Sequence, residues 1–279
     1  MTHSKITTVL LTISAALSAC GGGGSSTEDN QQITSVTVRA LAYSRQAVLF
    51  VSGTYLRADM TAVSGVCKDP VFNMTQSTPQ LAVLNCTVTA TGEQPLSITG
   101  TNGKVLYTGT VTVPQPQIEL VTSQGNVVLE LNPAAAPVSV NNFLSYTNSG
   151  FYTNTLFHRV IAGFVVQGGG YTKGLVKKAD QLAPIVLESN NGLFNTRGTL
   201  AMARANVPNS ATSEFYVNLV DNRSLDYQSP ANPGYAVFGK VVNGLDVIDK
   251  IAALRTASAN GFADVPTTDV TLQLALQIK

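Results

Sequence analysis

The stretch Phe157–Gly169 reads FHRVIAGFVVQGG and places one arginine and one glutamine among apolar residues before it ends on glycines. Side chains alternate in character through both halves, which is typical of β-strands. Ala162-Gly163 lies between the halves and allows the chain to turn there. The pattern therefore predicts that Arg159 and Gln167 lie on neighbouring strands beside an apolar wall. Spacing alone does not separate such a site from an ordinary strand pair whose arginine faces solvent.

The same stretch resembles the signature of the cyclophilin family of peptidyl-prolyl isomerases. Two later stretches, Asn190–Phe215 and Gly234–Val241, resemble the family's other motifs in the same order and at the same spacing. The resemblance covers roughly residues 117 to 279. It implies a mainly β fold, a closed antiparallel β-barrel capped by two helices. It also implies an enzyme that rotates X–Pro peptide bonds of polypeptides and needs no cofactor and no metal.

Residue patterns between 118 and 279 predict the same kind of fold. Strand-like runs flank Ser123–Asn126, as in a hairpin, and Pro137 opens a helical pattern. A second helical pattern follows Gly244. Every second residue from Val270 to Ile278 is apolar, which predicts a closing strand with one buried face.

The resemblance also implies roles for single residues. Arg159 matches the family's catalytic arginine, and Gln167 matches the glutamine that orients this arginine and the substrate. Four residues match the pocket for the proline ring: Phe164, Val165, Tyr216 and Leu225. Four more match positions that contact the substrate peptide, partly through the main chain: Ala203, Arg204, Glu214 and Tyr235.

Some of these positions depart from the family pattern. Val165 stands where methionine is common, and Ser224 stands where eukaryotic members carry tryptophan, so strong cyclosporin binding is not expected. Glu214 stands where the family usually has glutamine. A carboxylate there is expected to accept a bidentate pair of hydrogen bonds from Arg159 and to slow the enzyme. The alternative is that the Glu214 side chain faces solvent at the rim.

A function of another class is left open by these patterns. The barrel would then be a non-catalytic module or scaffold that binds proline-containing peptides. An intact Arg159 with Gln167 favours the enzyme, whereas Glu214 slightly favours the non-catalytic module.

Residues 1–19 predict export rather than a folded element. Lys5 precedes the short apolar run Ile6–Leu17, as in a signal peptide. Leu17–Cys20 reads LSAC and resembles a bacterial lipobox, which implies cleavage before the cysteine. The alternative is an ordinary secretory peptide that is cut near Ala19.

The lipobox resemblance implies that Cys20 is lipidated and anchors the protein to a membrane. The Gly/Ser-rich residues 20–32 would then form a flexible tether. Gly21, rather than an aspartate, follows the cysteine. This implies the outer membrane of a bacterial cell envelope, with the protein facing the periplasm.

Residues 33–113 predict a small all-β module. Apolar residues recur with a two-residue period, and Asn102-Gly103 between two strand-like runs is a strong hairpin signal. The expected architecture is an immunoglobulin-like sandwich, although the chain has no tryptophan and so lacks the antibody-type signature. The Pro-rich residues 114–117 are predicted to be the linker to residues 118–279.

Cys67 and Cys86 are the cysteines that remain beside Cys20, and two cysteines in an exported chain predict a disulfide. A metal site is the alternative, but the one histidine beyond the signal peptide, His158, is far away in sequence. We interpret His158 as a strand residue with satisfied hydrogen bonds and not as a triad base. The 17 basic and 16 acidic residues are scattered, so no nucleic-acid partner is expected.

Overall fold

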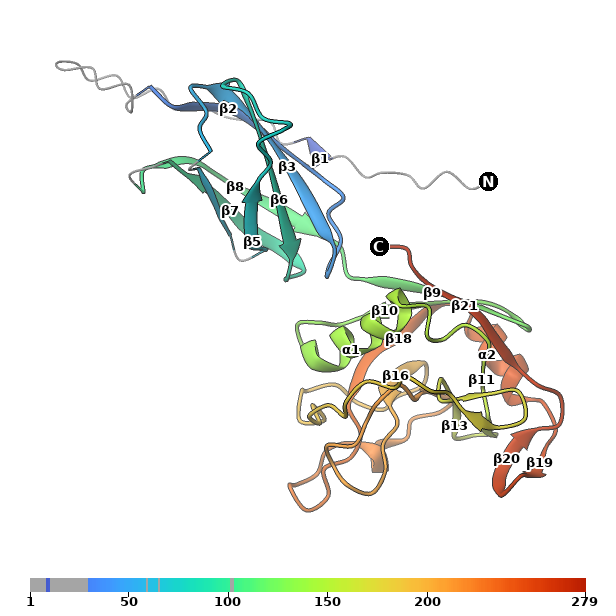
Figure 1. Cartoon of the computed structure of the whole chain (residues 1–279). Helices are drawn as coiled ribbons and strands as arrows, with labels where there is room; N and C mark the ends of the chain where they lie inside the picture. The colour runs from blue at the N-terminus through green and yellow to red at the C-terminus, as the bar shows by residue number, and fades with distance from the viewer. Residues whose placement is uncertain (1–8, 11–29, 59, 65, 101–102) are drawn as a thin grey trace. The chain divides into compact units, whose positions relative to one another are not determined.

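The computed structural model describes residues 9–10, 30–58, 60–64, 66–100 and 103–279 (Figure 1). Most of the expected signal peptide, Cys20, most of the expected tether and Asn102 lie outside these residues. The chain forms two compact units, divided between Pro114 and Gln115. Among the residues that the structure describes, no helix is both long enough and apolar enough to cross a membrane.

The first unit is one antiparallel sheet whose strands pair in the order β1-β2-β3-β6-β5-β4-β7-β8. Its strands are β1 (Val9–Leu10), β2 (Gln32–Arg39), β3 (Gln46–Thr54), β4 (Thr61–Ser64), β5 (Cys67–Phe72), β6 (Leu81–Val88), β7 (Gly92–Thr99) and β8 (Val105–Val113). The two runs around the predicted hairpin are the neighbours β7 and β8. The all-β prediction for this part of the chain is confirmed.

The core of the first unit is shared by both halves of its sheet. Buried side chains come from β2, β3 and β6 and also from β7 and β8: Val36, Val38, Leu49, Val51, Leu84, Cys86, Leu96, Ile98, Val111 and Val113. The sheet therefore folds over into two layers with the apolar residues between them, as expected for a sandwich (Figure 1). Cys67 and Cys86 form the predicted disulfide inside this core, with Cα atoms 5.4 Å apart. It joins the neighbouring strands β5 and β6.

The second unit contains a nine-stranded antiparallel sheet in the order β11-β21-β9-β10-β18-β16-β17-β13-β12. Its strands are β9 (Gln117–Thr122), β10 (Gly125–Leu131), β11 (Thr155–Leu156), β12 (Arg159–Ile161), β13 (Val165–Gly168), β16 (Thr199–Met202), β17 (Phe215–Asn218), β18 (Val237–Asn243) and β21 (Thr271–Gln277). The two end strands, β11 and β12, are separated in the chain only by Phe157 and His158. The sheet thus curls round until its ends meet, and the predicted barrel is confirmed.

Two short hairpins and a turn of 3-10 helix complete this unit. The hairpins are β14 (Tyr171–Thr172) with β15 (Val176–Lys177) and β19 (Thr256–Ala259) with β20 (Phe262–Pro266), and the 3-10 helix is η1 (Arg223–Leu225).

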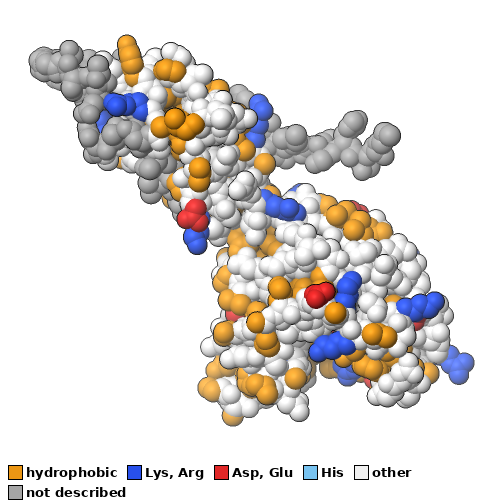
Figure 2. Space-filling model, in the orientation of Figure 1, with side chains coloured by type: hydrophobic (Ala, Val, Ile, Leu, Met, Phe, Trp, Pro, Cys, Tyr) orange, Lys and Arg blue, Asp and Glu red, His pale blue; other side chains and the backbone are white. Residues whose placement is uncertain are grey.

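On the face of the molecule in Figure 2, the Lys and Arg side chains are scattered singly and form no continuous basic area.

Both predicted helices are present and pack on the barrel. They are α1 (Pro137–Asn148) and α2 (Leu245–Ala252), with buried faces formed by Val140, Phe143, Leu144, Val247, Ile248 and Ile251. The Glu188 carboxylate accepts hydrogen bonds from the N–H groups of Val138 at 2.9 Å and Ser139 at 2.8 Å. A negative charge thereby sits at the N-terminus of α1, where the helix dipole favours it.

The closing strand β21 differs from the prediction in its second half. Strict alternation predicted one buried face, but Leu274 and Leu276 are 37% and 44% exposed. The register against β9 shifts between Leu272 and Leu274, where β21 holds one extra residue. Because successive strand residues point to opposite faces, one extra residue turns every later side chain over. Ala275 takes the buried position instead.

Candidate active site

Five neighbouring strands of the barrel contribute one residue each to a row. The register places these residues opposite one another in the order Arg159, Gln167, Tyr216, Ala201 and Val237. Directly opposite residues on paired strands point to the same side of a sheet. Arg159 Nη1 donates a hydrogen bond to Gln167 Oε1 at 3.2 Å. The prediction that Arg159 and Gln167 lie on neighbouring strands is confirmed.

A cavity of about 430 Å³ opens over this row. Its lining residues are Arg159, Phe164, Val165, Gln167, Ala203, Arg204, Tyr216, Leu225 and Tyr235. These are all the residues predicted for substrate contact or catalysis except Glu214. The site combines a cationic donor with an apolar wall, in which Val165 and Tyr216 are buried and Phe164 packs against them.

The far rim of the cavity is built around Tyr235. The guanidinium of Arg204 lies over the Tyr235 ring, 4.6 Å from its centroid, and Arg204 Nε donates to the Gly234 carbonyl at 3.0 Å. Gly234 has φ +61°, and a Cβ at this position would lie 2.5 Å from the Leu225 carbonyl oxygen. Glycine is therefore needed for the close approach that brings Tyr235 next to Leu225.

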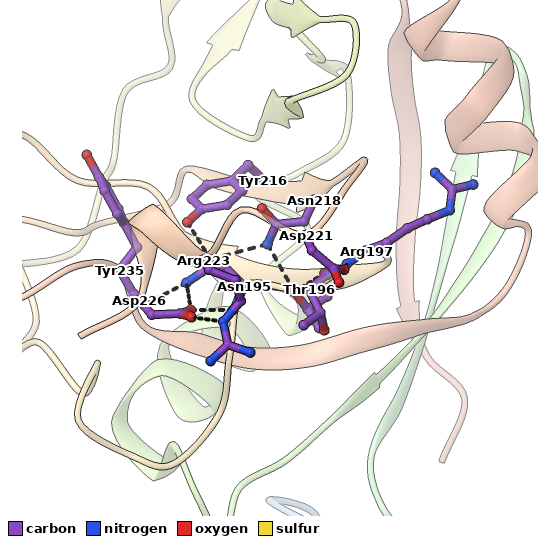
Figure 3. Close-up of polar contacts among 10 residues, drawn as sticks. Asn195, Thr196, Arg197, Tyr216, Asn218, Asp221, Arg223, Asp226 and Tyr235 are labelled. Carbon is purple, nitrogen blue, oxygen red and sulfur yellow. Dashed lines mark hydrogen bonds and ion pairs between the residues drawn. The ribbon is translucent and has the colours of Figure 1, made fainter. Parts of the chain in front are cut away.

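A buried polar network holds the base of the pocket (Figure 3). Tyr216 Oη donates to Asn195 Oδ1 at 2.8 Å, so the hydroxyl points away from the cavity and into the network. The Asp226 carboxylate accepts from the Asn195 main-chain N–H at 2.6 Å and from Arg223 Nε. Burial raises the pKa of Tyr216, which keeps the phenol neutral and able to donate. Our sequence analysis missed Asn195 and Asp226, because no motif marks partners 31 residues apart.

Glu214 does not form the expected pair with Arg159, and that prediction is wrong. Its Oε2 atom accepts a hydrogen bond from Gln167 Nε2 at 2.9 Å and lies 3.2 Å from His158 Nε2. The carboxylate lines a second cavity of about 420 Å³, which adjoins the first and shares Gln167, Ala203 and Arg204 with it. Glu214 directly precedes β17, and its carboxylate contacts the Gln167 amide nitrogen and His158 instead of the Arg159 guanidinium.

The environment of Glu214 keeps it ionised. Burial alone would raise the pKa of this carboxyl group. The hydrogen bond and charge of His158, the hydrogen bond from Gln167 and the charge of Lys177 together lower the pKa below its ordinary value of 4.5. At neutral pH the group is a carboxylate, which can only accept hydrogen bonds.

His158 has a role that our sequence analysis did not assign. Its side chain is 3% exposed and precedes β12, with one nitrogen on Glu214 and the ring 4.6 Å from that of Tyr171. Its Nδ1 atom is buried and has no hydrogen-bond partner in the part of the chain that the structure describes. Only Nε2 therefore has a hydrogen-bond partner, so the prediction that the hydrogen bonds of His158 are satisfied is wrong.

A further cavity of about 340 Å³ lies over β10 and β18, and it shares no residue with the predicted site. Within the described ranges, no three His, Cys, Asp or Glu side chains are grouped so that they could hold a metal ion. The arginine, the glutamine and the apolar pocket meet in the first cavity.

Comparison with known proteins agrees with this geometry. Residues 117–275 match the sequence model of the family described as cyclophilin type peptidyl-prolyl cis-trans isomerase/CLD. Peptidyl-prolyl cis-trans isomerase cyp18 of Streptomyces antibioticus is 50% identical over 160 residues, which are 57% of this chain and 96% of that protein. Peptidyl-prolyl cis-trans isomerase B of Escherichia coli (strain K12) is 49% identical over 154 residues, 54% of this chain and 93% of that protein.

Among solved structures, a cyclophilin type peptidyl-prolyl cis-trans isomerase of Cryptosporidium parvum in the presence of the dipeptide Ala-Pro matches with a TM-score of 0.48 and 24% identity. The match covers 58% of this chain and 98% of that one. The family match spans more than half of the present chain, and the bacterial relatives are covered almost completely. This chain therefore belongs to the cyclophilin-type peptidyl-prolyl cis-trans isomerases.

Proposed function

We propose that this isomerase rotates X–Pro bonds in proteins exported to a bacterial cell envelope, with Arg159 as its catalytic residue. The observation that carries the catalytic part is that Arg159 and an apolar pocket line one cavity. The observation that supports export is the sequence of residues 1–20, with its apolar run and its lipobox-like LSAC. A lipid on Cys20 would hold the enzyme at the outer membrane, facing the periplasm.

The reaction needs a site that binds a twisted amide. Rotation about the peptide bond has a barrier of about 18–20 kcal/mol because the nitrogen shares its lone pair with the carbonyl. A catalyst accelerates it by binding the twisted form more tightly than either planar form. No covalent bond to the substrate is required.

Arg159 supplies the donor for this twisted form. When the amide twists, the prolyl nitrogen regains its lone pair and becomes a hydrogen-bond acceptor. A guanidinium aimed at that nitrogen stabilises the twisted amide and leaves the planar forms unaffected. The pocket of Phe164, Val165, Tyr216 and Leu225 would hold the proline ring while the carbonyl on its other side turns.

Ala203 and Arg204, which follow β16, provide main-chain groups for the rest of the peptide. The Ala203 N–H already donates to the Glu214 carbonyl at 3.0 Å, so this N–H is not the group that binds the substrate. The Ala203 carbonyl and the Arg204 N–H remain for that purpose. The position of the substrate peptide along the cleft would then be fixed by the main chain of Ala203 and Arg204 together with the proline pocket.

The rival function, a non-catalytic module that binds proline-containing peptides, has lost its support. It rested on a Glu214 carboxylate that would occupy the donors of Arg159. The donors of Arg159 meet the neutral amide oxygen of Gln167 instead. The guanidinium therefore keeps its charge and donors for a substrate.

Export and anchoring are tested by expressing the full chain in a Gram-negative host beside a Cys20→Ser variant. Mass spectrometry of the parent should find an acylated N-terminal cysteine, and fractionation should place the protein in the outer membrane. The variant should appear in a soluble fraction, with isomerase activity on an X–Pro peptide retained. Membrane association that Cys20→Ser leaves unchanged would refute the anchor.

A further inference from the structure

We propose that Glu214 is a positioning residue, which fixes the direction of the Gln167 side-chain amide and through it the guanidinium of Arg159. The inference rests on the catalytic role proposed for Arg159. Three contacts in series carry it: Arg159 Nη1 to Gln167 Oε1 at 3.2 Å, Gln167 Nε2 to Glu214 Oε2 at 2.9 Å, and Glu214 Oε2 to His158 Nε2 at 3.2 Å.

The amide of Gln167 has two ends of nearly equal shape, and its neighbours decide which end faces which. Arginine has donors only, and a carboxylate has acceptors only. With the oxygen toward Arg159 and the nitrogen toward Glu214, both contacts are hydrogen bonds. After a flip, two donors would face each other on one side and two acceptors on the other. Arg159 and Glu214 together therefore allow only one orientation of the Gln167 amide, in which its oxygen accepts a hydrogen bond from the Arg159 guanidinium.

A glutamine at position 214 would not impose this choice. Its side chain can present either a donor or an acceptor, so both orientations of Gln167 would find a partner. The hydrogen bond from Gln167 would also lose its charge-assisted character and weaken. The carboxylate is thus the feature that removes the ambiguity.

His158 holds the carboxylate from the other side. The Nδ1 atom of His158 is buried without a partner in the described chain, whereas Nε2 faces a carboxylate, which can only accept hydrogen bonds. An N–H on Nδ1 would leave a buried donor unpaired, and the lone pair of Nε2 would face the carboxylate. The proton therefore belongs on Nε2, where it is donated to Glu214. Tyr171 and Phe262 pack against this ring and keep it in place.

Gly170 supplies the space that the Glu214 side chain occupies. A Cβ at position 170 would lie 2.5 Å from Glu214 Cγ, 2.7 Å from Cδ and 2.8 Å from Oε1, closer than atoms can approach. These three nearest atoms all belong to the Glu214 side chain. A Gly170→Ala substitution would therefore displace the carboxylate while Gln167 and Arg159 themselves are not substituted.

The test measures kcat and KM separately for the cis-to-trans rotation of a short X–Pro peptide by the full mature chain. Glu214→Ala should lower kcat about fivefold to tenfold, because a misdirected guanidinium loses most of its effect on the twisted amide. KM should stay within about twofold, because the proline pocket is untouched. Glu214→Gln should lower kcat by a smaller factor. Glu119→Gln, on β9 away from the site strands, is the control for the change of charge.

Gly170→Ala makes the test specific. Alone it should lower kcat about as much as Glu214→Ala, and in the Glu214→Ala background it should have no further effect, because the clashing atoms are gone. Additive effects of the two substitutions would overturn the proposal. So would a kcat of Glu214→Ala within twofold of the parent, or a loss confined to KM.

Two further results keep the test decisive. If Glu214→Ala does not fold, as judged by its melting curve, Glu214→Gln decides, and an unchanged or raised kcat in that variant contradicts the proposal. Arg159→Ala, measured in the same assay, tests the catalytic role of Arg159 separately from the positioning role of Glu214. Full activity of Arg159→Ala would refute the catalytic role of Arg159, whereas an inactive Arg159→Ala with a fully active Glu214→Ala would refute only the role of Glu214.

Discussion

Arg159 and Gln167 stand directly opposite each other on β12 and β13, and one guanidinium nitrogen of Arg159 donates to the Gln167 amide oxygen. Both residues are thus presented by the rigid wall of the barrel and not by a loop. This contact uses one of the five donors of the guanidinium. The others can serve the prolyl amide from a fixed position.

Replacing Arg159 should remove most of the catalysis and leave the fold intact. Arg159→Ala is expected to lower kcat/KM at least tenfold, which corresponds to about 1.4 kcal/mol of lost transition-state stabilisation. Arg159→Lys should also be poor, because an ammonium group lacks the planar fork that Gln167 orients. The measurement is the isomerisation of an X–Pro peptide, with thermal melting as the control for folding. Two nearly fully active variants would refute the mechanism.

The hydroxyl of Tyr216 should matter for stability more than for activity. Tyr216→Phe removes the donor to Asn195 Oδ1, which still accepts from Asn218 Nδ2 at 3.2 Å. The free energy of unfolding should fall by about 1 kcal/mol, while kcat/KM stays within about twofold because the hydroxyl faces away from the cavity. Tyr216→Ala, in contrast, should raise KM because it removes a wall of the proline pocket. Urea unfolding and the peptide assay together check both expectations.

The disulfide should stabilise the first unit alone. Cys67 and Cys86 are 19 residues apart in sequence, and closing a loop of this length contributes about 3 kcal/mol in the chain-entropy model. Reduction or a Cys67→Ser/Cys86→Ser double variant should lower the melting temperature of the first unit. Isomerase activity should not change, because the family match and the proposed active site lie in the second unit. Free thiols in protein purified without a reductant would contradict the bridge.

The Glu214 carboxyl should make stability depend on pH in the acid range. Burial alone would raise its pKa, but the hydrogen bond and charge of His158 and the hydrogen bond from Gln167 outweigh burial, so the pKa in the folded chain lies below the ordinary value of 4.5. The folded state therefore gains stability from this group above pH 4.5 and loses it as the pH falls through the folded pKa. Glu214→Gln has no such titration. The difference in unfolding free energy between parent and variant should shrink between pH 7 and pH 3, and a constant difference would be the contrary result.

The barrel and most of the cavity could be predicted because they rest on local patterns and a specific family resemblance. Phe157–Gly169 carries its own turn, so the pairing of Arg159 with Gln167 follows from a short stretch. The cavity is lined by residues from several motifs that are far apart in sequence. It was predictable only because these motifs follow one another in the order typical of the family. The lipid anchor and the client proteins stay predictions.

Two features could not be read from the sequence for physical reasons. The bulge in β21 leaves the alternation of leucines intact in the sequence and changes only which face they occupy. The partners of Glu214 depend on the direction of its side chain. Arg159 and His158 are adjacent in the chain, yet Arg159 contacts the amide oxygen of Gln167, whereas His158 contacts the carboxylate that accepts from the amide nitrogen. Period-two patterns identify the face of a strand but not the neighbour that a long polar side chain chooses.

The meeting of β11 and β12 has a consequence for an isomerase that acts on X–Pro peptide bonds. Unfolded segments carry unpaired main-chain groups that add readily to the border of any open sheet, which is how aggregates begin. A sheet whose first and last strands are joined through only two residues leaves such segments little border to extend. The nine-stranded sheet of this unit therefore offers a bound X–Pro segment little open border at which to add as a further strand.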